Sequence, residues 1–528
     1  MKSPGLYWRT LRHLTPRQLI YQVWNRLRGR PRLNWTSADA NVPSLPLPIT
    51  FTLLNQSVTF TERIDWNYAT NGKLWTYTLN YFDWLTPPEH GSTLTPYPFS
   101  GQGGDSIRDG VALIHAFIQQ TNDLRDGLEP YPTSLRLLNW RSFLLREGIQ
   151  DSFIERHMYA QTALLRSRLE YHLGGNHLLE NACALTMMAV HFQHRLWFAD
   201  GAKLLANQLH EQFLTDGGHY ERSPVYHQLL TGRLLDLYAV LLTSSWVTDA
   251  TLIRYVREKI AAMLNWLVTV TFRDGSVPMV NDAAYGVAPT TAGLLAKAAP
   301  LGFRPTQIQL TDSGYRMLTT PRLEVFIDVA PVGPDHQPGH AHADTFSFVL
   351  HIDGQPVVVD PGTSTYQIGE RRRWERSTAA HNTVTVSDQN SSELWSGFRV
   401  GRRAQVTILT DLPCCVEAAH DGYAYLGDRH TRRWTLLDET TLRVDDCFID
   451  NNLARKSHLY FDHYLYLTTE QQVVTLANCA VQFVSEKPLS VNLTTYDQAL
   501  GFNRTATASC VSLDVPTTVM TTLFTVRL

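Results

Sequence analysis

The spacing of hydrophobic residues changes part-way along this chain. From about residue 104 to 300, apolar residues recur every three or four positions, which is the spacing of helices with one buried face. Clear examples are the sets Ile154, Met158, Leu165, Leu169, then Leu230, Leu234, Leu237, Leu241, and then Leu252, Val256, Ile260, Met263, Leu267. Short links that hold Gly, Asp, Asn and Pro separate these segments. The pattern predicts an all-α region built from antiparallel helix pairs.

Beyond about residue 311 the period shortens to two. Leu323, Val325 and Ile327 alternate with other residues, and short strand-like runs with polar turns recur to the C-terminus. Such runs are typical of a β-sandwich. A chain of 528 residues is too long for one core, so two large domains are expected. The predicted division is a lead-in over 1–65, a helical domain over 66–310 and a β domain over 311–528.

One stretch of the β domain, from Gly339 to Val386, concentrates polar chemistry. His340 and His342 precede a strand-like run, Asp353-Gly354 predicts a hairpin turn, and Asp360 follows the return strand. His381 stands before the next strand. His342, Asp360 and His381 together form a nitrogen–nitrogen–oxygen ligand set that suits zinc. The alternative is that these residues only satisfy turns and strand ends.

Two links of the helical region also hold candidate residues. In the first, a Gly-rich turn leads to Asn176, and His177 and Glu180 share one helix face. An N-cap asparagine beside an ordinary ion pair would give the same pattern. In the second, Pro224 suits the first turn of a helix and would hold Tyr226 near the helix start.

Several of these motifs resemble those of the heparinase II/III-like polysaccharide lyases. The motifs are Gly-His-Ala-His-Ala-Asp (339–344), Val-Asp-Pro-Gly-Thr (359–363), Ser-Thr-Ala-Ala-His-Asn (377–382), Leu-Asn-Tyr-Phe-Asp (79–83) and the run from 131 to 140. The resemblance covers most of the chain. It implies a multidomain α+β fold, in which an N-terminal incomplete (α/α) toroid is followed by a C-terminal antiparallel β-sandwich.

The resemblance also implies roles for individual residues. It assigns one structural zinc ion to His342, Asp360 and His381, and it places His340 at the catalytic centre. Asn176, His177 and Tyr226 correspond to the helical half of the cleft. Glu180 corresponds to the second member of a His-x-x-Glu pair, and Arg136 to a helix that lines the cleft.

Elimination across C4–C5 of a uronic acid makes three chemical demands. The substrate carboxylate needs hydrogen bonds that strengthen as charge moves onto it, a role open to Asn176 and His177. A base must remove the C5 proton and an acid must protonate O4 as it leaves. Tyr226 is the expected acid, and either His340 or Tyr226 the base, depending on the stereochemistry at C5.

Arginines add a possible binding surface for an acidic substrate. Those at 371–373 and 376 suit bidentate contacts to carboxylate or sulfate, so Arg372 and Arg376 are expected to bind substrate together with Arg136 and Glu180. A solvated loop explains the run equally well.

These observations predict a lyase that acts on a uronate-containing polysaccharide or oligosaccharide. A uronate C5-epimerase would use the same residues, because reprotonation at C5 from the other face gives an epimer. A non-catalytic glycan-binding or assembly protein is the third reading. The sequence leaves the glycan, the linkage and the oligomeric state open.

Charge and composition limit the partners. A net charge of −3 and a pI near 6.7 argue against nucleic-acid binding over the whole surface. The six cysteines are scattered, which favours a reducing compartment. Residues 1–33 hold eight Lys or Arg and no acidic residue, yet they lack the apolar core of a signal peptide. We therefore expect a cytoplasmic protein that works on a bacterial surface polysaccharide. Its basic N-terminal helix either contacts an anionic membrane or packs on its own toroid.

Overall fold

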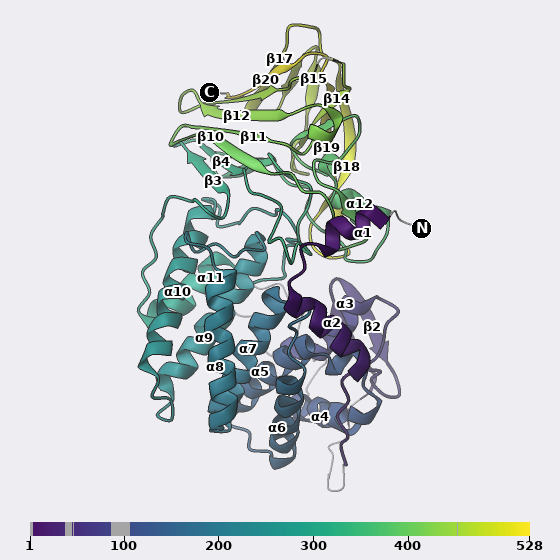
Figure 1. The fold of residues 1–528 in the computed structure, drawn as a ribbon, viewed down its shortest axis with the longest axis vertical. Helices are drawn as coiled ribbons and strands as arrows, with labels where there is room; N and C mark the ends of the chain where they lie inside the picture. Colours follow the sequence, from purple (N-terminus) through teal and green to yellow (C-terminus); the bar gives the residue numbers. More distant parts are fainter. Residues whose placement is uncertain (1–3, 37–44, 46, 86–105, 451, 528) are drawn as a thin grey trace.

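The chain folds into a helical half and a β half, one above the other (Figure 1). The computed structural model describes residues 4–36, 45, 47–85, 106–450 and 452–527. The last helical turn of the helical half ends at Leu301 and the first strand of the β half starts at Tyr315, so the change of period read from the sequence falls between them.

The helical half is an incomplete (α/α) toroid. Its helices are α3 (Lys73–Tyr81), α4 (Ser106–Gln119), α5 (Pro130–Arg146), α6 (Ser152–Ser167), α7 (Gly175–His191), α8 (Arg195–Gln212), α9 (Pro224–Thr243), α10 (Ala250–Val270) and α11 (Thr291–Ala298). Helix α7 contacts α5, α8 and α9 and is buried on almost every side. The predicted apolar stripe of α10 faces the core, since Val256, Ile260 and Met263 are fully buried. A small hairpin of β1 (Ile49–Leu53) and β2 (Gln56–Phe60) packs beside α3.

The β half is built from antiparallel sheets. The largest runs in the order β10 (Val406–Leu412), β11 (Cys415–His420), β12 (His430–Leu436), β13 (Thr441–Cys447), β20 (Val519–Val526), β17 (Cys479–Val484), β16 (Val473–Thr475) and β15 (Thr468–Glu470). A second runs β18 (Val491–Ala499), β19 (Thr505–Asp514), β14 (Arg455–Tyr460), β7 (Val384–Val386). A third runs β3 (Tyr315–Thr319), β4 (Leu323–Asp328), β5 (Phe348–Ile352), β6 (Gln355–Val358), and β8 (Leu394–Trp395) pairs with β9 (Arg399–Val400). Apolar side chains of the three larger sheets share one core, as expected for a sandwich.

The predicted hairpin is present, with one change at its start. Asp353 and Gly354 both have positive φ, as a type I′ hairpin turn requires, and they join β5 to β6. The strand begins at Phe348, because Phe346 takes a left-handed conformation. The arginine-rich stretch, for which a solvated loop was one of the two interpretations, forms the short helix α12 (Glu370–Glu375).

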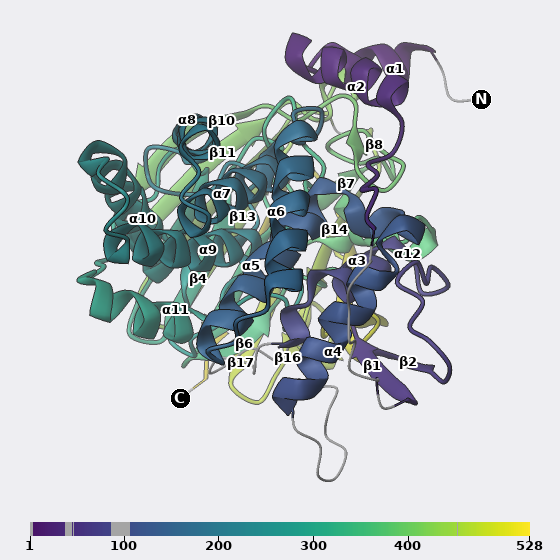
Figure 2. The ribbon, with the colours of Figure 1, turned by 90° about the horizontal axis from the view of Figure 1, so that it is seen from below.

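Two N-terminal helices, α1 (Pro4–Leu11) and α2 (Pro16–Arg28), lie on the outside of the molecule. Figures 1 and 2 place α1 against the β half and α2 across the helical half. Among the described residues, every helix is too short or too polar to cross a membrane.

Candidate active site between the two halves

Tyr226 and His340 come from opposite halves of the molecule and meet at their interface. Pro224 opens α9, and the Ser223 hydroxyl accepts a hydrogen bond from the Tyr226 N–H at 3.4 Å. The Tyr226 and His340 rings lie with their centroids 4.2 Å apart. The Tyr226 hydroxyl is 2.9 Å from the hydroxyl of Tyr366. Burial, with the nearby Tyr366 and Asp282, raises the pKa of Tyr226 well above its ordinary value, so the phenol keeps its proton at neutral pH.

Asp282, in the link between α10 and α11, is the hub of this interface and contacts both histidines of the β half. Its Oδ2 is 2.9 Å from His340 Nδ1 and its Oδ1 is 2.9 Å from His342 Nε2. Both oxygens also accept hydrogen bonds from the guanidinium of Arg372. Burial alone would raise the pKa of Asp282, but Arg372 and the hydrogen bonds from the two histidines hold it well below its ordinary value. Asp282 therefore stays ionised and fixes the orientation of His340.

Glu221 joins the site from the helical half. Its Oε1 accepts a hydrogen bond from the Asn176 N–H at 2.8 Å, and its Oε2 lies 3.7 Å from His340 Nε2. Burial raises the pKa of Glu221. A side chain at Gly175 would clash, because a Cβ there would lie 2.2 Å from Glu221 Oε1. The absence of a side chain at Gly175 leaves room for Glu221 at the start of α7, and the positive φ of this residue also favours glycine.

The start of α7 presents two of the predicted residues to the same interface. Asn176 is buried, and its side-chain oxygen has no hydrogen-bond partner among the described residues. His177 stacks on Tyr131 with ring centroids 4.1 Å apart, and its Nδ1 is 3.1 Å from Glu170 Oε1. Burial lowers the pKa of His177, but Glu170 outweighs it and the net shift is upward. A raised pKa favours a cationic His177, which suits an acidic ligand.

Glu180, expected to act with His177, has another partner. Its Oε2 accepts a hydrogen bond from Arg233 at 2.7 Å, and the carboxylate is almost fully buried. Burial raises the pKa of Glu180 despite the attraction of Arg233. This contact makes it a buried partner of α9 and leaves little of it for a substrate.

The three arginines expected to bind substrate are buried among protein groups. Arg136 is fully buried, donates to Gln161 and to the Asn80 and Gly127 carbonyls, and burial lowers its pKa to about 9. Arg372 is committed to Asp282. Arg376 donates to the Ala341 carbonyl at 2.8 Å, and burial lowers its pKa to about 10. These three side chains are almost completely buried in the ligand-free structure, and their contact with substrate stays a prediction.

The predicted zinc ligands are close together and only partly satisfied. His381 Nδ1 is 2.8 Å from Asp360 Oδ2, and the His342 and His381 rings have centroids 5.3 Å apart. His342 Nδ1 and His381 Nε2 are buried without a hydrogen-bond partner among the described residues. Two such imidazole nitrogens suit a metal ion that takes nitrogen donors. Within the described ranges, however, no three His, Cys, Asp or Glu side chains converge as a ligand set. The zinc site stays a prediction.

Three residues of this site carried no prediction from sequence. Asp282 lies 58 residues before His340, Glu221 reaches His340 from the helical half, and Tyr366 contacts Tyr226, which is 140 residues away along the chain. Glu221 stands three residues before Pro224, so its closeness to a predicted helix start was a weak signal, whereas Asp282 stands in none of the motifs named above.

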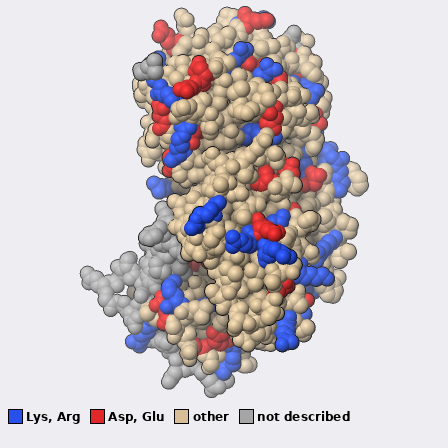
Figure 3. All heavy atoms as spheres, turned by 90° about the vertical axis from the view of Figure 1, so that its left-hand side faces the viewer, with Lys and Arg blue, Asp and Glu red and all other residues tan. Residues whose placement is uncertain are grey.

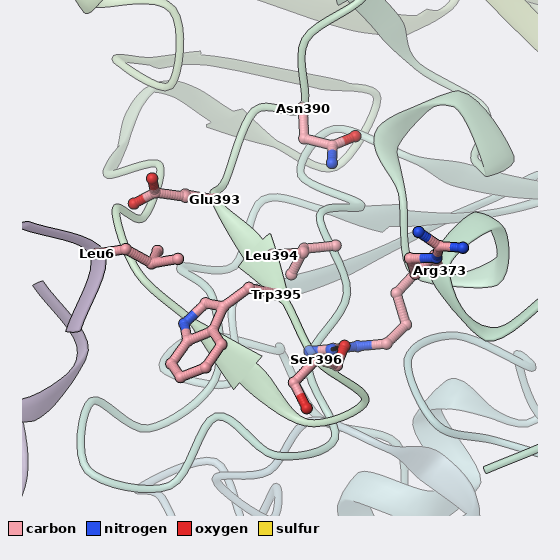
Figure 4. Close-up of a pocket in the computed structure, with 8 residues that line it drawn as sticks. Leu6, Arg373, Asn390, Glu393, Leu394, Trp395 and Ser396 are labelled. Atoms are coloured by element: carbon pink, nitrogen blue, oxygen red, sulfur yellow. Dashed lines mark hydrogen bonds between the residues drawn. The ribbon is translucent and has the colours of Figure 1, made fainter. Parts of the chain in front are cut away.

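Two cavities lie apart from Tyr226 and His340. One, of about 440 Å³, is lined by Leu6 of α1 together with Arg373, Glu393 and Trp395 (Figure 4). Another, of about 330 Å³, lies behind the hairpin and includes Asp360, Asp462 and His463. On the face drawn in Figure 3, acidic and basic side chains are interspersed. We place the candidate site at the Tyr226–His340 interface because its groups converge there, not because of cavity size.

Comparison with known proteins gives the same picture of the whole chain. The family model described as "Heparinase II/III N-terminus" matches residues 133–295, and "Heparinase II/III-like, C-terminal" matches residues 304–510. The chain is 23% identical over 260 residues to a heparin-sulfate lyase of Bacteroides stercoris, covering 42% of this chain and 37% of that protein. It is 32% identical over 62 residues to an alginate lyase of Stenotrophomonas maltophilia (strain K279a), covering 10% of this chain and 8% of that protein. The matches thus span well under half of these curated relatives.

Solved structures share the fold at low identity. A heparinase III structure has a TM-score of 0.66 at 15% identity, over 97% of this chain and 85% of that one. A heparan sulfate lyase mutant of Pedobacter heparinus has a TM-score of 0.60 at 16% identity, over 97% and 88% of the chains. A chondroitinase AC lyase has a TM-score of 0.51 at 10% identity, over 89% and 78%. These likenesses establish the architecture of a helical toroid followed by a β-sandwich.

Proposed function

The chain belongs to the heparinase II/III-like family, and from this premise we propose that it is a polysaccharide lyase that cleaves a uronate-containing glycan by β-elimination. The observation that carries the proposal is the contact of Tyr226 with His340 across the two halves, with Asp282 on the far side of the imidazole. The similar proteins are named a heparin-sulfate lyase, an alginate lyase and a chondroitinase AC lyase, and the glycans in these names all contain uronic acid.

The proton donor in this proposal is Tyr226. Its raised pKa keeps the phenol protonated, so it can give its proton to O4 as the C4–O4 bond breaks. The same shift argues against Tyr226 as the base in the ligand-free protein. Tyr366, hydrogen-bonded to the Tyr226 hydroxyl, is positioned to hold that hydroxyl in place or to return a proton to it.

The base is His340. When Nδ1–H donates to the ionised Asp282, the Nε2 lone pair is free to take the C5 proton of a uronate. Proton removal leaves the C5 electrons and the carboxylate as one delocalised anion. Those electrons then form the C4–C5 double bond as O4 leaves with the proton of Tyr226.

The start of α7 stabilises that anion. The side-chain NH₂ of Asn176 and a cationic His177 are the proposed donors on the helical side, and their hydrogen bonds would strengthen as charge moves onto the substrate carboxylate. Arg372 acts indirectly, since it keeps Asp282 ionised while Asp282 orients His340.

We further propose that His342, Asp360 and His381 hold one zinc ion with a structural role. Bound there, the ion would fix the loops on either side of the β5–β6 hairpin; elimination requires no metal-activated water. Protein purified without chelators is expected to carry about one zinc per chain, and His342→Ala to lose most of it and unfold at a lower temperature. His463→Ala, outside the set, is the matched control. Less than about a tenth of an equivalent of zinc in wild type would contradict the assignment.

The product distinguishes the lyase from its nearest alternative. Purified protein is incubated with separate heparan sulfate, alginate, chondroitin and polygalacturonate samples, and ultraviolet absorbance of a new C4–C5 double bond is followed. A lyase gives absorbance and shorter chains. A C5-epimerase gives solvent deuterium at C5 with chain length unchanged, and that result would replace the proposed reaction.

A further inference from the structure

Helix α2 is amphipathic in the opposite sense to a normal surface helix. Its polar side faces the protein: the Gln18 amide donates to the His336 carbonyl at 3.0 Å, and Arg28 donates to the Ser167 carbonyl at 2.7 Å. Asn25 contacts His172 at 2.9 Å. Its apolar side faces outward and is 43% to 75% exposed. That side consists of Leu19, Ile20, Val23, Trp24 and Leu27.

Helix α1 repeats the arrangement. Arg9 makes two hydrogen bonds to Glu393, at 2.6 and 2.7 Å, and the Thr10 hydroxyl accepts from Trp395 Nε1 at 3.0 Å. Tyr7, Trp8 and Leu11 are left 45% to 68% exposed. Eight large apolar side chains thus stand in solvent on two consecutive helices, anchored to the protein by polar contacts. An exposed apolar surface of this kind marks an interaction site.

Charge selects the partner for this surface. Residues 1–33 carry one Lys and seven Arg with no Asp or Glu, in a chain whose net charge is −3. Arg12 and Arg26 are exposed and follow or precede the exposed Leu11 and Leu27 directly in the chain. Apolar and aromatic residues flanked by arginines are the pattern of helices that lie in the interface of an anionic bilayer. Tryptophan and tyrosine are enriched at that depth.

We propose that α1 and α2 dock the protein on an anionic membrane surface, inserting Trp8, Ile20, Trp24 and Leu27 among the lipid headgroups while the arginines contact lipid phosphates. A second copy of the chain fits less well, because pairing these faces would bring like charges together. The proposal is independent of the reaction assigned to the cleft.

Helix α2 also contacts the loops that lead to the candidate active site. The Gln18 amide bridges the Leu173 and His336 carbonyls, which lie three residues before Asn176 and four before His340. The membrane-bound helix therefore ties together the loops that lead to both sides of the cleft. Docking would hold the cleft near the lipid surface, where a lipid-linked glycan would be present.

The test uses the full chain and vesicles. Sedimentation with vesicles of phosphatidylcholine plus phosphatidylglycerol is compared with vesicles of phosphatidylcholine alone, at low and high salt. Wild type is expected to bind the anionic vesicles, to bind neutral ones at least about tenfold more weakly, and to be released in part by salt. Ile20→Glu/Trp24→Glu should lose binding by about tenfold or more while unfolding at the wild-type temperature.

The matched control is Leu196→Glu/Ile449→Glu, which changes aliphatic side chains 67% and 68% exposed elsewhere on the surface. It should bind vesicles as wild type does. Equal loss in both double variants, or no preference for anionic lipid, would overturn the proposal. A dimer in analytical ultracentrifugation that Ile20→Glu/Trp24→Glu dissociates would assign the surface to a second copy instead.

Discussion

Asp282 and Asp446 stand at the centres of two clusters with nearly the same chemistry. Asp282 bonds His340, His342 and both terminal nitrogens of Arg372. Asp446 Oδ1 lies 2.6 Å from His430 Nε2. Arg432 donates to both carboxylate oxygens, from Nε to Oδ1 at 2.6 Å and from a terminal nitrogen to Oδ2 at 2.9 Å. Each is a buried carboxylate with a bidentate arginine and at least one imidazole.

The clusters differ in what lies on their far side. His340 keeps some exposure and faces Tyr226 and Glu221 of the other half. His430 is sealed within the β half beside His420, and Arg432 also donates to the Phe346 and Asn382 carbonyls. Arg432 thereby braces loops that surround the predicted metal ligands. A buried Asp–His–Arg cluster therefore does not by itself indicate a functional site. The exposure of its histidine and the residues that the histidine faces distinguish the two clusters.

The largest effect should separate the two histidines. His340→Ala removes the proposed base, and positioned proton transfer is worth about 10²–10⁴-fold, so kcat should fall by that factor with little change in Tm. His430→Ala should destabilise by about 1–3 kcal/mol through unsatisfied buried groups, while kcat per folded molecule is retained. Steady-state kinetics and thermal unfolding of both variants check this. A folded His430→Ala as inactive as His340→Ala would break the comparison.

Replacing either aspartate should lower the free energy of unfolding by a similar amount. Asp282→Ala and Asp446→Ala each strand a buried arginine, and losing one partner of a buried pair costs about 3–5 kcal/mol. Urea unfolding measures both. Asp446→Ala/Arg432→Met should recover part of the loss, because the unpaired charge is removed with its partner. An unchanged unfolding free energy in Asp446→Ala would show that the pair contributes nothing.

Acid should weaken the stabilisation that the buried Asp446 cluster gives to the folded state. Burial would raise the pKa of Asp446, but Arg432 and His430 lower it from 3.8 to about 2. A lowered carboxyl pKa stabilises the folded state above the unfolded-state value, and this stabilisation is lost as the pH falls from about 4 to about 2. The difference in unfolding free energy between wild type and Asp446→Asn should shrink by about 2 kcal/mol over that interval. A difference independent of pH would contradict the ion pair.

The smallest expected effect on kcat concerns the hydrogen bonds of Gln18, which connect the loops on the two sides of the cleft. Gln18→Ala removes the amide that bridges the Leu173 and His336 carbonyls, at a cost of about 0.5–1.5 kcal/mol. We expect a few-fold lower kcat, since the loop leading to His340 is less restrained, and unchanged vesicle binding. The contribution of the Asp446 cluster to the pH dependence of the unfolding free energy should stay unchanged. Loss of vesicle binding with normal turnover would show that Gln18 serves only the docking surface.

The fold could be predicted largely because its signals are local. Helical and two-residue periods, short links, the Asp353-Gly354 turn and Pro224 at a helix start all act over a few residues. Arrangements that depend on distant packing could not be predicted. Asp282 lies 58 residues before His340, and no local pattern links them.

The arginines and α2 show the same limit. Arg372 and Arg376 are four residues apart, so helix α12 and the residue that follows it place both side chains on one buried side. A solvated loop would instead have exposed both side chains to water. In α2 the sequence indicated a basic amphipathic helix. Which side meets the protein depends on the carbonyls that Gln18 and Arg28 find on the toroid and the β half.

The central claim is that Tyr226 donates the proton across the interface of the two halves. Tyr226→Phe keeps the ring against His340 and removes only the hydroxyl. On the uronate polymer that wild type cleaves, kcat read from the absorbance of the C4–C5 double bond should fall by about 10²–10⁴-fold, with an unchanged Tm. Near-normal formation of the unsaturated product by Tyr226→Phe would contradict the account.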